Sequence, residues 1–147
     1  MNKEKIIVYT DGGSRGNPGP SAVGVVVKSH GEVLIKKYSK EIGERTNNEA
    51  EYEAVVLSLQ KIKQLFGKEK VKDMEIEIRM DSELVARQLG GVYKIEEERL
   101  FPLFIKTWNL KMDFKKVVFK EIPREKNKEA DFLVNQELNK KQQQSIF

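Results

Sequence analysis

Four acidic residues carry the chemistry that this sequence is best equipped to perform. Asp11 and Asp81 each end a predicted strand, and Glu51 and Asp131 each lie in the second turn of a predicted helix. Carboxylates without a nearby constellation of histidine or cysteine offer only hard oxygen ligands, which suit Mg²⁺ or Mn²⁺ rather than Zn²⁺. The four residues are therefore candidate ligands of divalent metal ions.

Each acid also has a structural explanation that needs no metal. Asp11 begins an Asp-Gly pair, which is common in turns, and Asp81 could cap the helix that follows it. Glu51 could be a solvated helix residue, and Asp131 could favour the dipole at its helix start. Glu49 is assigned to helix capping. A shared site is favoured because Asp11 and Asp81 are expected at the same rim of a parallel strand pair, where α/β sheets bind ligands.

Other catalytic chemistries find little support. The glycine-rich turn after Asp11 lacks the Gly-Lys-Ser/Thr of a phosphate-binding loop, and its spacing is not Gly-x-Gly-x-x-Gly. His30 is the single histidine and falls in a predicted hairpin turn. Ser14 and Ser82 have no histidine beside them, which argues against a serine triad.

The elements that must position the acids follow from hydrophobic patterning. Thr46 and Glu49 form a capping box, and Gly67 ends the helix that they start. Short links between the first three strands predict an antiparallel meander, and helical crossovers predict parallel strands after it. The strands are expected at residues 5–10, 22–28, 33–38, 74–80 and 116–122, and further helices at residues 82–89, 96–108 and 128–138. The predicted class is α/β, with a five-stranded mixed sheet flanked by helices.

Composition narrows the setting. The 147 residues suffice for one domain with a core, and 34% of them are charged. The net charge of +4 is compatible with a polyanionic partner but is weak support for one. No apolar run approaches the roughly 20 residues of a membrane span, so we expect no membrane contact. The absence of cysteine fits a reducing compartment, and we expect a cytoplasmic location.

Four segments, in chain order, resemble the motifs of type 1 ribonuclease H. They are Tyr-Thr-Asp-Gly-Gly-Ser-Arg-Gly-Asn-Pro-Gly-Pro at 9–20, Thr-Asn-Asn-Glu-Ala-Glu-Tyr at 46–52, Met-Asp-Ser-Glu-Leu-Val at 80–85 and Pro-Arg-Glu-Lys-Asn-Lys-Glu-Ala-Asp at 123–131. The resemblance extends over about residues 5–138 and implies a ribonuclease H-like fold. We therefore expect a catalytic domain at residues 1–138 and a polar, disordered tail at residues 139–147.

The resemblance implies a catalytic, metal-binding quartet of Asp11, Glu51, Asp81 and Asp131. It also implies hydrolysis of the RNA strand of an RNA/DNA hybrid, leaving 5′-phosphate and 3′-hydroxyl ends. Two Mg²⁺ ions are expected, for which Mn²⁺ could substitute. The chemistry is consistent, because two metal ions that share the scissile phosphate can activate a water and stabilise the leaving oxygen.

The resemblance further implies contacts with the substrate. Selectivity for RNA must come from the 2′-hydroxyl group, which distinguishes RNA from DNA. Capping alone would explain Thr46, and turn chemistry alone would explain Asn17, so each has two readings. The expected substrate-binding residues are Gly12, Gly13, Ser14, Asn17, Thr46, Asn47, Asn48 and Arg124.

Two departures from the family pattern affect these expectations. Many members carry a histidine in the loop before the last aspartate, whereas residues 123–128 contain none. Arg124 or Lys126 is expected to replace it electrostatically. The long basic protrusion of some members is also missing, and residues 90–112 contain Glu96-Glu97-Glu98. The chain resembles compact, archaeal-type members, and we expect weaker hybrid binding and a possible activity on double-stranded RNA.

The sequence leaves two other functions open, and it also suggests one protein partner. The chain could be a non-catalytic binder of hybrid or double-stranded nucleic acid, although four clustered acids repel a polyanion without metal. It could also be a resolvase or transposase domain, against which the second motif argues. Gln143-Gln144-Ser145-Ile146-Phe147 resembles a peptide that binds bacterial sliding clamps, and a frayed terminus is the simpler explanation.

Overall fold

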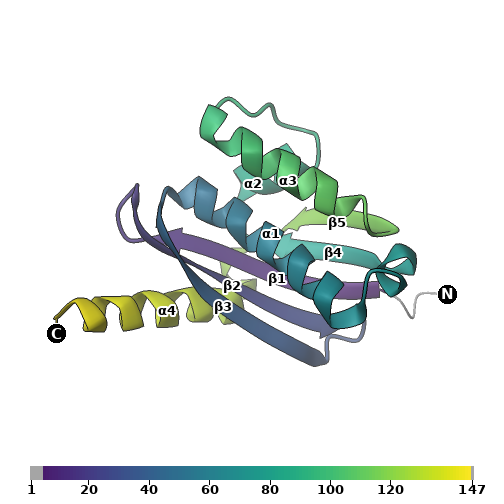
Figure 1. Cartoon of the computed structure of the whole chain (residues 1–147), viewed down its shortest axis with the longest axis horizontal. Helices are drawn as coiled ribbons and strands as arrows, with labels where there is room; N and C mark the ends of the chain where they lie inside the picture. The colour runs from purple at the N-terminus through teal and green to yellow at the C-terminus, as the bar shows by residue number, and fades with distance from the viewer. Residues whose placement is uncertain (1–4, 147) are drawn as a thin grey trace.

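The structure, a computed structural model, describes residues 5–146, with side chains as far as Gln143. Five strands, four α-helices and three short 3-10 helices follow one another along this part of the chain (Figure 1). In order they are β1 Lys5–Ser14, β2 Gly19–Ser29, β3 Leu34–Arg45, α1 Asn47–Phe66, η2 Lys70–Asp73, β4 Glu75–Met80, α2 Glu83–Leu89, η3 Glu98–Leu100, α3 Phe101–Lys111, β5 Lys116–Glu121, η4 Arg124–Lys126 and α4 Lys128–Ile146.

The strands form one mixed sheet in the order β3-β2-β1-β4-β5. β1 and β3 pair antiparallel with β2, whereas β4 pairs parallel with β1 and β5. This arrangement confirms the predicted fold class. It also confirms the topological argument, because the two antiparallel pairs have short connections and the parallel pairs are joined by helical crossovers.

The strands of the meander are longer than predicted. Pairing between β1 and β2 continues to Ser14 opposite Ser21, beyond the predicted end of the strand at residue 10. The parallel pairing with β4 stops at Tyr9 opposite Arg79. Asp11 is therefore wrongly predicted to end its strand. It lies inside β1, on the part of the strand that only β2 still pairs.

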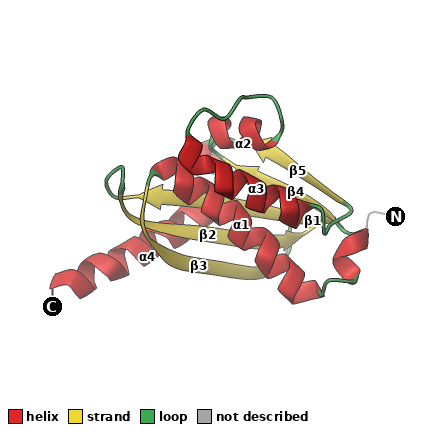
Figure 2. Cartoon of the chain, turned by 45° about the horizontal axis from the view of Figure 1, so that its top comes forward, coloured by secondary structure: helices red, strands yellow, loops and turns green. Residues whose placement is uncertain are grey.

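Helices cover both faces of the sheet. α1, α2 and α3 lie over one face, and α4 packs against the other (Figures 1 and 2). The main core lies beneath α1, where Tyr52, Leu59 and Ile62 are fully buried. A smaller cluster under α4 consists of Ala22, Val134 and Leu138. Both helices are thus fixed to the sheet by apolar contacts.

The predicted start and end of α1 are confirmed. The Thr46 hydroxyl accepts a hydrogen bond from the Glu49 backbone N–H, and the Glu49 carboxylate accepts one from the Thr46 N–H. Gly67 follows the last residue and donates to the Lys63 carbonyl. The helix predicted at residues 96–108 is instead a 3-10 turn followed by α3, with Pro102 in the first turn of α3.

The C-terminal segment differs from the prediction. α4 was expected to end at residue 138 before a disordered tail, but it continues to Ile146. Polar residues of this extension are anchored, because Arg15 donates to the side-chain oxygens of Asn139 and Gln142 at 2.7 and 2.8 Å. The side chains of residues 144–147 lie outside the described part, so the sliding-clamp contact stays a prediction.

The helices also bear on the question of a membrane. Within residues 5–146, none of them combines the length and the apolar character that a bilayer crossing requires.

Candidate functional site

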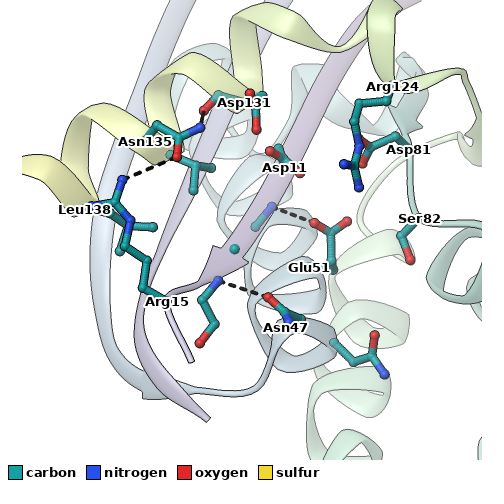
Figure 3. A pocket seen from close by; sticks show the side chains of 15 residues that line it. Asp11, Arg15, Asn47, Glu51, Asp81, Ser82, Arg124, Asp131, Asn135 and Leu138 are labelled. Atoms are coloured by element: carbon teal, nitrogen blue, oxygen red, sulfur yellow. Dashed lines mark hydrogen bonds and ion pairs between the residues drawn. The ribbon is translucent and has the colours of Figure 1, made fainter. Parts of the chain in front are cut away.

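Three of the four candidate acids meet at one point. Asp11, Glu51 and Asp81 each offer a carboxylate oxygen, and these oxygens lie within 4.8 Å of one another. The sheet register explains two of them, because Asp11 and Asp81 each follow the Tyr9–Arg79 pair by two residues. Glu51 reaches the same point from the second turn of α1 (Figure 3).

A glycine in β1 permits the close approach of α1. A Cβ atom added to Gly12 would lie 2.1 Å from the carbonyl oxygen of Ala50, so no larger residue fits here. The Gly12 N–H donates a hydrogen bond of 2.8 Å to Oε1 of Glu51. The backbone next to Asp11 therefore holds the carboxylate of Glu51 in place.

A second glycine does the same for α4. A Cβ atom added to Gly24 of β2 would lie 2.4 Å from the carbonyl oxygen of Ala130. Gly24 is also the β2 partner of Asp11 in the antiparallel pairing. Contact at Gly24 thus brings α4 onto the strand pair that carries Asp11 and sets the position of Asp131, the next residue of the helix.

The loop before α4 is tied to β1 as well. Asn127 is buried, and its side-chain N–H donates to the carbonyl oxygen of Thr10 at 2.9 Å. Its Oδ1 atom has no hydrogen-bond partner among the described residues, so the side chain does not cap α4 although Asn127 directly precedes that helix. The bond to Thr10 instead fixes the start of α4 beside Asp11.

The fourth acid lies at the edge of the site. Asp131 is exposed, and it lines the same pocket of about 480 Å³ as the other three acids (Figure 3). Two of the structural explanations for single acids can now be rejected. Glu51 is only 8% exposed and is no solvated helix residue. Ser82, rather than Asp81, caps α2, because its hydroxyl accepts from the Val85 N–H.

Crowding of carboxylates changes their acidity. Burial, followed by the charges of Asp81 and Asp131, raises the pKa of Asp11 from 3.8 to about 7, although a hydrogen bond to Glu51 acts in the opposite direction. Burial and the charge of Asp11 raise the pKa of Glu51 well above its ordinary value. The site therefore disfavours its own negative charge and is suited to a cation that would neutralise it.

The donor set indicates which cation fits. All candidate ligand atoms are carboxylate oxygens, and no histidine or cysteine belongs to the cluster found among the described residues. Such oxygens are typical ligands of Mg²⁺ and Mn²⁺. The residues present thus fit a hard divalent cation.

Most of the predicted substrate-binding residues surround the acids. Gly12, Gly13, Ser14, Asn47, Asn48 and Arg124 line the pocket. Arg124 is exposed, and its Nε lies 3.6 Å from Oδ2 of Asp81. Asn48 donates from its side-chain nitrogen to Oε1 of Glu97 at 2.9 Å. The loop before α3 therefore contacts one edge of the site.

The other two predicted residues do not line the pocket. Asn17 accepts a hydrogen bond from the Asn47 N–H at 2.9 Å, and Asn47 accepts one from the Ser14 N–H at 3.0 Å. These two bonds attach the glycine-rich turn to the first residue of α1. Thr46 is buried in its capping box. Asn17 and Thr46 thus support the pocket by fixing the start of α1, without lining the pocket themselves.

Several lining residues were missed in the sequence. Ser82, Val134, Asn135, Leu138 and Arg15 also line the pocket. Asn135 and Leu138 lie four and seven residues after Asp131, which is the spacing of one helix face. That spacing would have identified them, whereas nothing in the sequence next to Arg15 indicates that it reaches α4.

Comparison with known proteins gives a consistent family. A family model described as reverse transcriptase-like matches residues 9–137. Ribonuclease HI of Halobacterium salinarum is 36% identical over 135 residues, which cover 92% of this chain and 65% of that protein. The bifunctional protein Rv2228c of Mycobacterium tuberculosis is 35% identical over 132 residues. The chain spans about a third of the length of that mycobacterial relative, with 35% of it covered.

Solved structures extend the likeness to the fold. LC11-RNase H1, solved in complex with an RNA/DNA hybrid, is 50% identical, has a TM-score of 0.84, and matches 89% of this chain and 94% of its own. RNase H1 of Halobacterium salinarum is 34% identical, with a TM-score of 0.85 and coverages of 92% and 98%. The N-terminal RNase H domain of Rv2228c is 32% identical, with a TM-score of 0.86 and coverages of 96% and 98%.

Proposed function

Because this chain belongs to the reverse transcriptase-like family, and within it to the type 1 ribonucleases H, we propose that it is an endoribonuclease that hydrolyses the RNA strand of RNA/DNA hybrids. The observation that supports this most is the meeting of the Asp11, Glu51 and Asp81 carboxylates in an open pocket beside the glycine-rich turn. A relative that is 50% identical was solved with such a hybrid.

Asp11, Glu51, Asp81 and Asp131 are the proposed metal ligands. Their four negative charges match two divalent cations, and Mg²⁺ is the expected ion, with Mn²⁺ as a substitute. Two such ions would activate a water and stabilise the leaving 3′-oxygen, giving 5′-phosphate and 3′-hydroxyl ends. The residues of the chain hold the carboxylates in place, chiefly through the Gly12 N–H bond to Glu51.

We propose that the glycine-rich turn recognises the RNA strand. Gly12 and Gly13 line the pocket with backbone atoms, and the bonds from Ser14 to Asn47 and from Asn47 to Asn17 hold the turn rigid. Rigid backbone groups beside the acids can contact the 2′-hydroxyl of the nucleotide that is cut. This would select RNA over DNA at that position.

Side chains at the other edge are proposed to bind the phosphate backbone. Arg124 is 89% exposed next to Asp81 and occupies the loop in which many relatives carry a histidine. Its guanidinium can contact a phosphate near the scissile bond. Unlike a histidine, Arg124 cannot act as a general acid or base, because a guanidinium stays protonated at working pH. We therefore assign it a binding role.

Several finer expectations stay predictions. Cleavage of double-stranded RNA, a sliding-clamp contact through Gln143 to Phe147 and a cytoplasmic location are of this kind. The first is tested together with the main proposal, the second by clamp pull-down with and without residues 143–147, and the third by cell fractionation.

The experiment is a substrate panel for the purified chain in Mg²⁺. We expect cutting of the RNA strand of a labelled hybrid, with little cutting of single-stranded RNA or duplex DNA, and duplex RNA in the same panel tests the predicted side activity. Asp11→Asn should abolish cleavage and retain hybrid binding. The matched control is Asp73→Asn, a change of the same type at η2. Binding of the hybrid without cleavage by the wild-type chain in either Mg²⁺ or Mn²⁺ would refute the proposal and favour a binding protein.

A further inference from the structure

Arg15 occupies an unusual position at the end of the pocket. It belongs to the glycine-rich turn, but its guanidinium lies along α4, where it donates to the side-chain oxygens of three amide residues (Figure 3 shows the first of them). The distances are 3.5 Å to Asn135, 2.7 Å to Asn139 and 2.8 Å to Gln142. The side chain is thus held in one place although it is exposed.

The charge of Arg15 is not neutralised by these contacts. All three acceptors are uncharged amide oxygens, and no carboxylate among the described residues forms an ion pair with Arg15. A guanidinium has five N–H donors, of which three are used here. A positioned cation with donors to spare can donate a charge-assisted hydrogen bond to a phosphate oxygen.

Arg15 is also continuous with the acidic site. Asp131, Asn135 and Asn139 are four residues apart on α4, so they follow one face of the helix. From Asp131 to Asn139 the helix rises about 12 Å, and one nucleic-acid strand advances about 3.4 Å per nucleotide along its axis. Arg15 and the acids line one pocket, a few nucleotides apart on this scale.

We propose that Arg15 binds a backbone phosphate of the RNA strand, a few nucleotides from the scissile phosphate, and that the amide side chains of α4 position it for this contact. The inference rests on the proposed function, because it requires a nucleic-acid strand in the pocket. It gives the helical extension beyond Leu138 a role in the site, since Asn139 and Gln142 belong to that extension.

The test compares Arg15→Ala and Arg15→Lys with the wild type. The matched control is Lys68→Ala, which removes the same charge from an exposed residue just after the distal end of α1. Hydrolysis of the hybrid gives KM and kcat. Binding is measured in an Asp11→Asn background at several salt concentrations, so that the RNA remains intact. Thermal unfolding of each variant reports any loss of structure.

We expect Arg15→Ala to raise KM roughly three- to tenfold with kcat nearly unchanged. This increase in KM lies between the effect of losing an exposed ion pair and that of losing a charge-assisted hydrogen bond. The salt dependence of log Kd should become shallower by about 0.7–0.9, the value for one lost phosphate contact. Lys68→Ala should change neither quantity. Arg15→Lys should retain the salt dependence but restore only part of the affinity.

A scan of the RNA strand with single neutral methylphosphonates then identifies the phosphate. At one position of the RNA strand, the methylphosphonate should weaken binding of the hybrid by the protein that keeps Arg15. The same methylphosphonate should not weaken binding by the Arg15→Ala variant any further. An unchanged salt dependence in Arg15→Ala, or a loss that only follows a fall in thermal stability, would overturn the assignment to Arg15. Failure of the wild-type chain to cleave or bind hybrid would instead refute the proposed function.

Discussion

Asp11→Asn should stabilise the metal-free protein while abolishing its activity. Asp11 is buried next to three other acids, and burial, followed by the charges of Asp81 and Asp131, raises its pKa from 3.8 to about 7. The folded state therefore binds a proton more tightly than the unfolded state does. Between pH 3.8 and about pH 7, the free energy of unfolding must therefore fall as the pH rises.

The size of the effect follows from the same shift. A rise in pKa from 3.8 to about 7 corresponds to about 4 kcal/mol at pH values above both. Side chains and water relax around an ionised group, so we expect about 2–4 kcal/mol in practice. The amide in Asp11→Asn has the shape of the carboxylate without its charge. The gain should be full above about pH 7 and should decline to almost nothing near pH 4.

The assay is urea unfolding of both proteins in the presence of a chelator, from pH 4 to pH 8. Saturating Mg²⁺ should then remove most of this difference, because ligand binding stabilises the wild type by about 2.7 kcal/mol at a hundredfold excess over Kd. Equal stabilities at pH 8 without metal, or a less stable Asp11→Asn, would show that the carboxylates are not in electrostatic conflict.

Three further changes test how the fold holds the site. Gly24→Ala should destabilise the protein by about 1–3 kcal/mol and lower kcat, because the new Cβ atom would press on α4 beside Asp131. The control Gly31→Ala should change neither stability nor kcat, because a Cβ atom there meets nothing closer than 4.0 Å. Thr46→Ala should cost about 1 kcal/mol in urea unfolding through loss of the cap, and a similar loss in Thr46→Ser would contradict that reason. Glu97→Gln should lower KM for the hybrid roughly two- to fivefold by removing a charge next to Asn48, and an unchanged KM would place Glu97 outside the substrate path.

The sequence was sufficient for the fold class and for the convergence of the acids. Alternating and helical hydrophobic patterns gave the order of the elements, and the Thr46 capping box placed Glu51 in the second turn of α1. The parallel relation of β1 and β4 placed Asp11 and Asp81 side by side. These features depend on local patterning and on simple topological rules, and they could be predicted for that reason.

Features that depend on contacts between distant segments were missed. Gly24 looks like an ordinary strand residue until the carbonyl oxygen of Ala130 is seen against it. The end of α4 was predicted too early, because the partner of its polar extension is Arg15, more than 120 residues away along the chain. The hydrogen bond from the Asn127 amide to Thr10, which ties α4 to β1, likewise joins segments that lie far apart in the sequence.

The acidic cluster is tested most directly by the single-turnover rate of RNA cleavage in an RNA/DNA hybrid as Mg²⁺ is titrated into chelator-treated protein. We expect no cleavage without metal and a rate that rises and saturates with Mg²⁺, with 5′-phosphate and 3′-hydroxyl products. Glu51→Gln should stay at background at every Mg²⁺ concentration. Cleavage in the presence of chelator, or a normal metal response in Glu51→Gln, would contradict the assignment of the acidic cluster as the catalytic metal site.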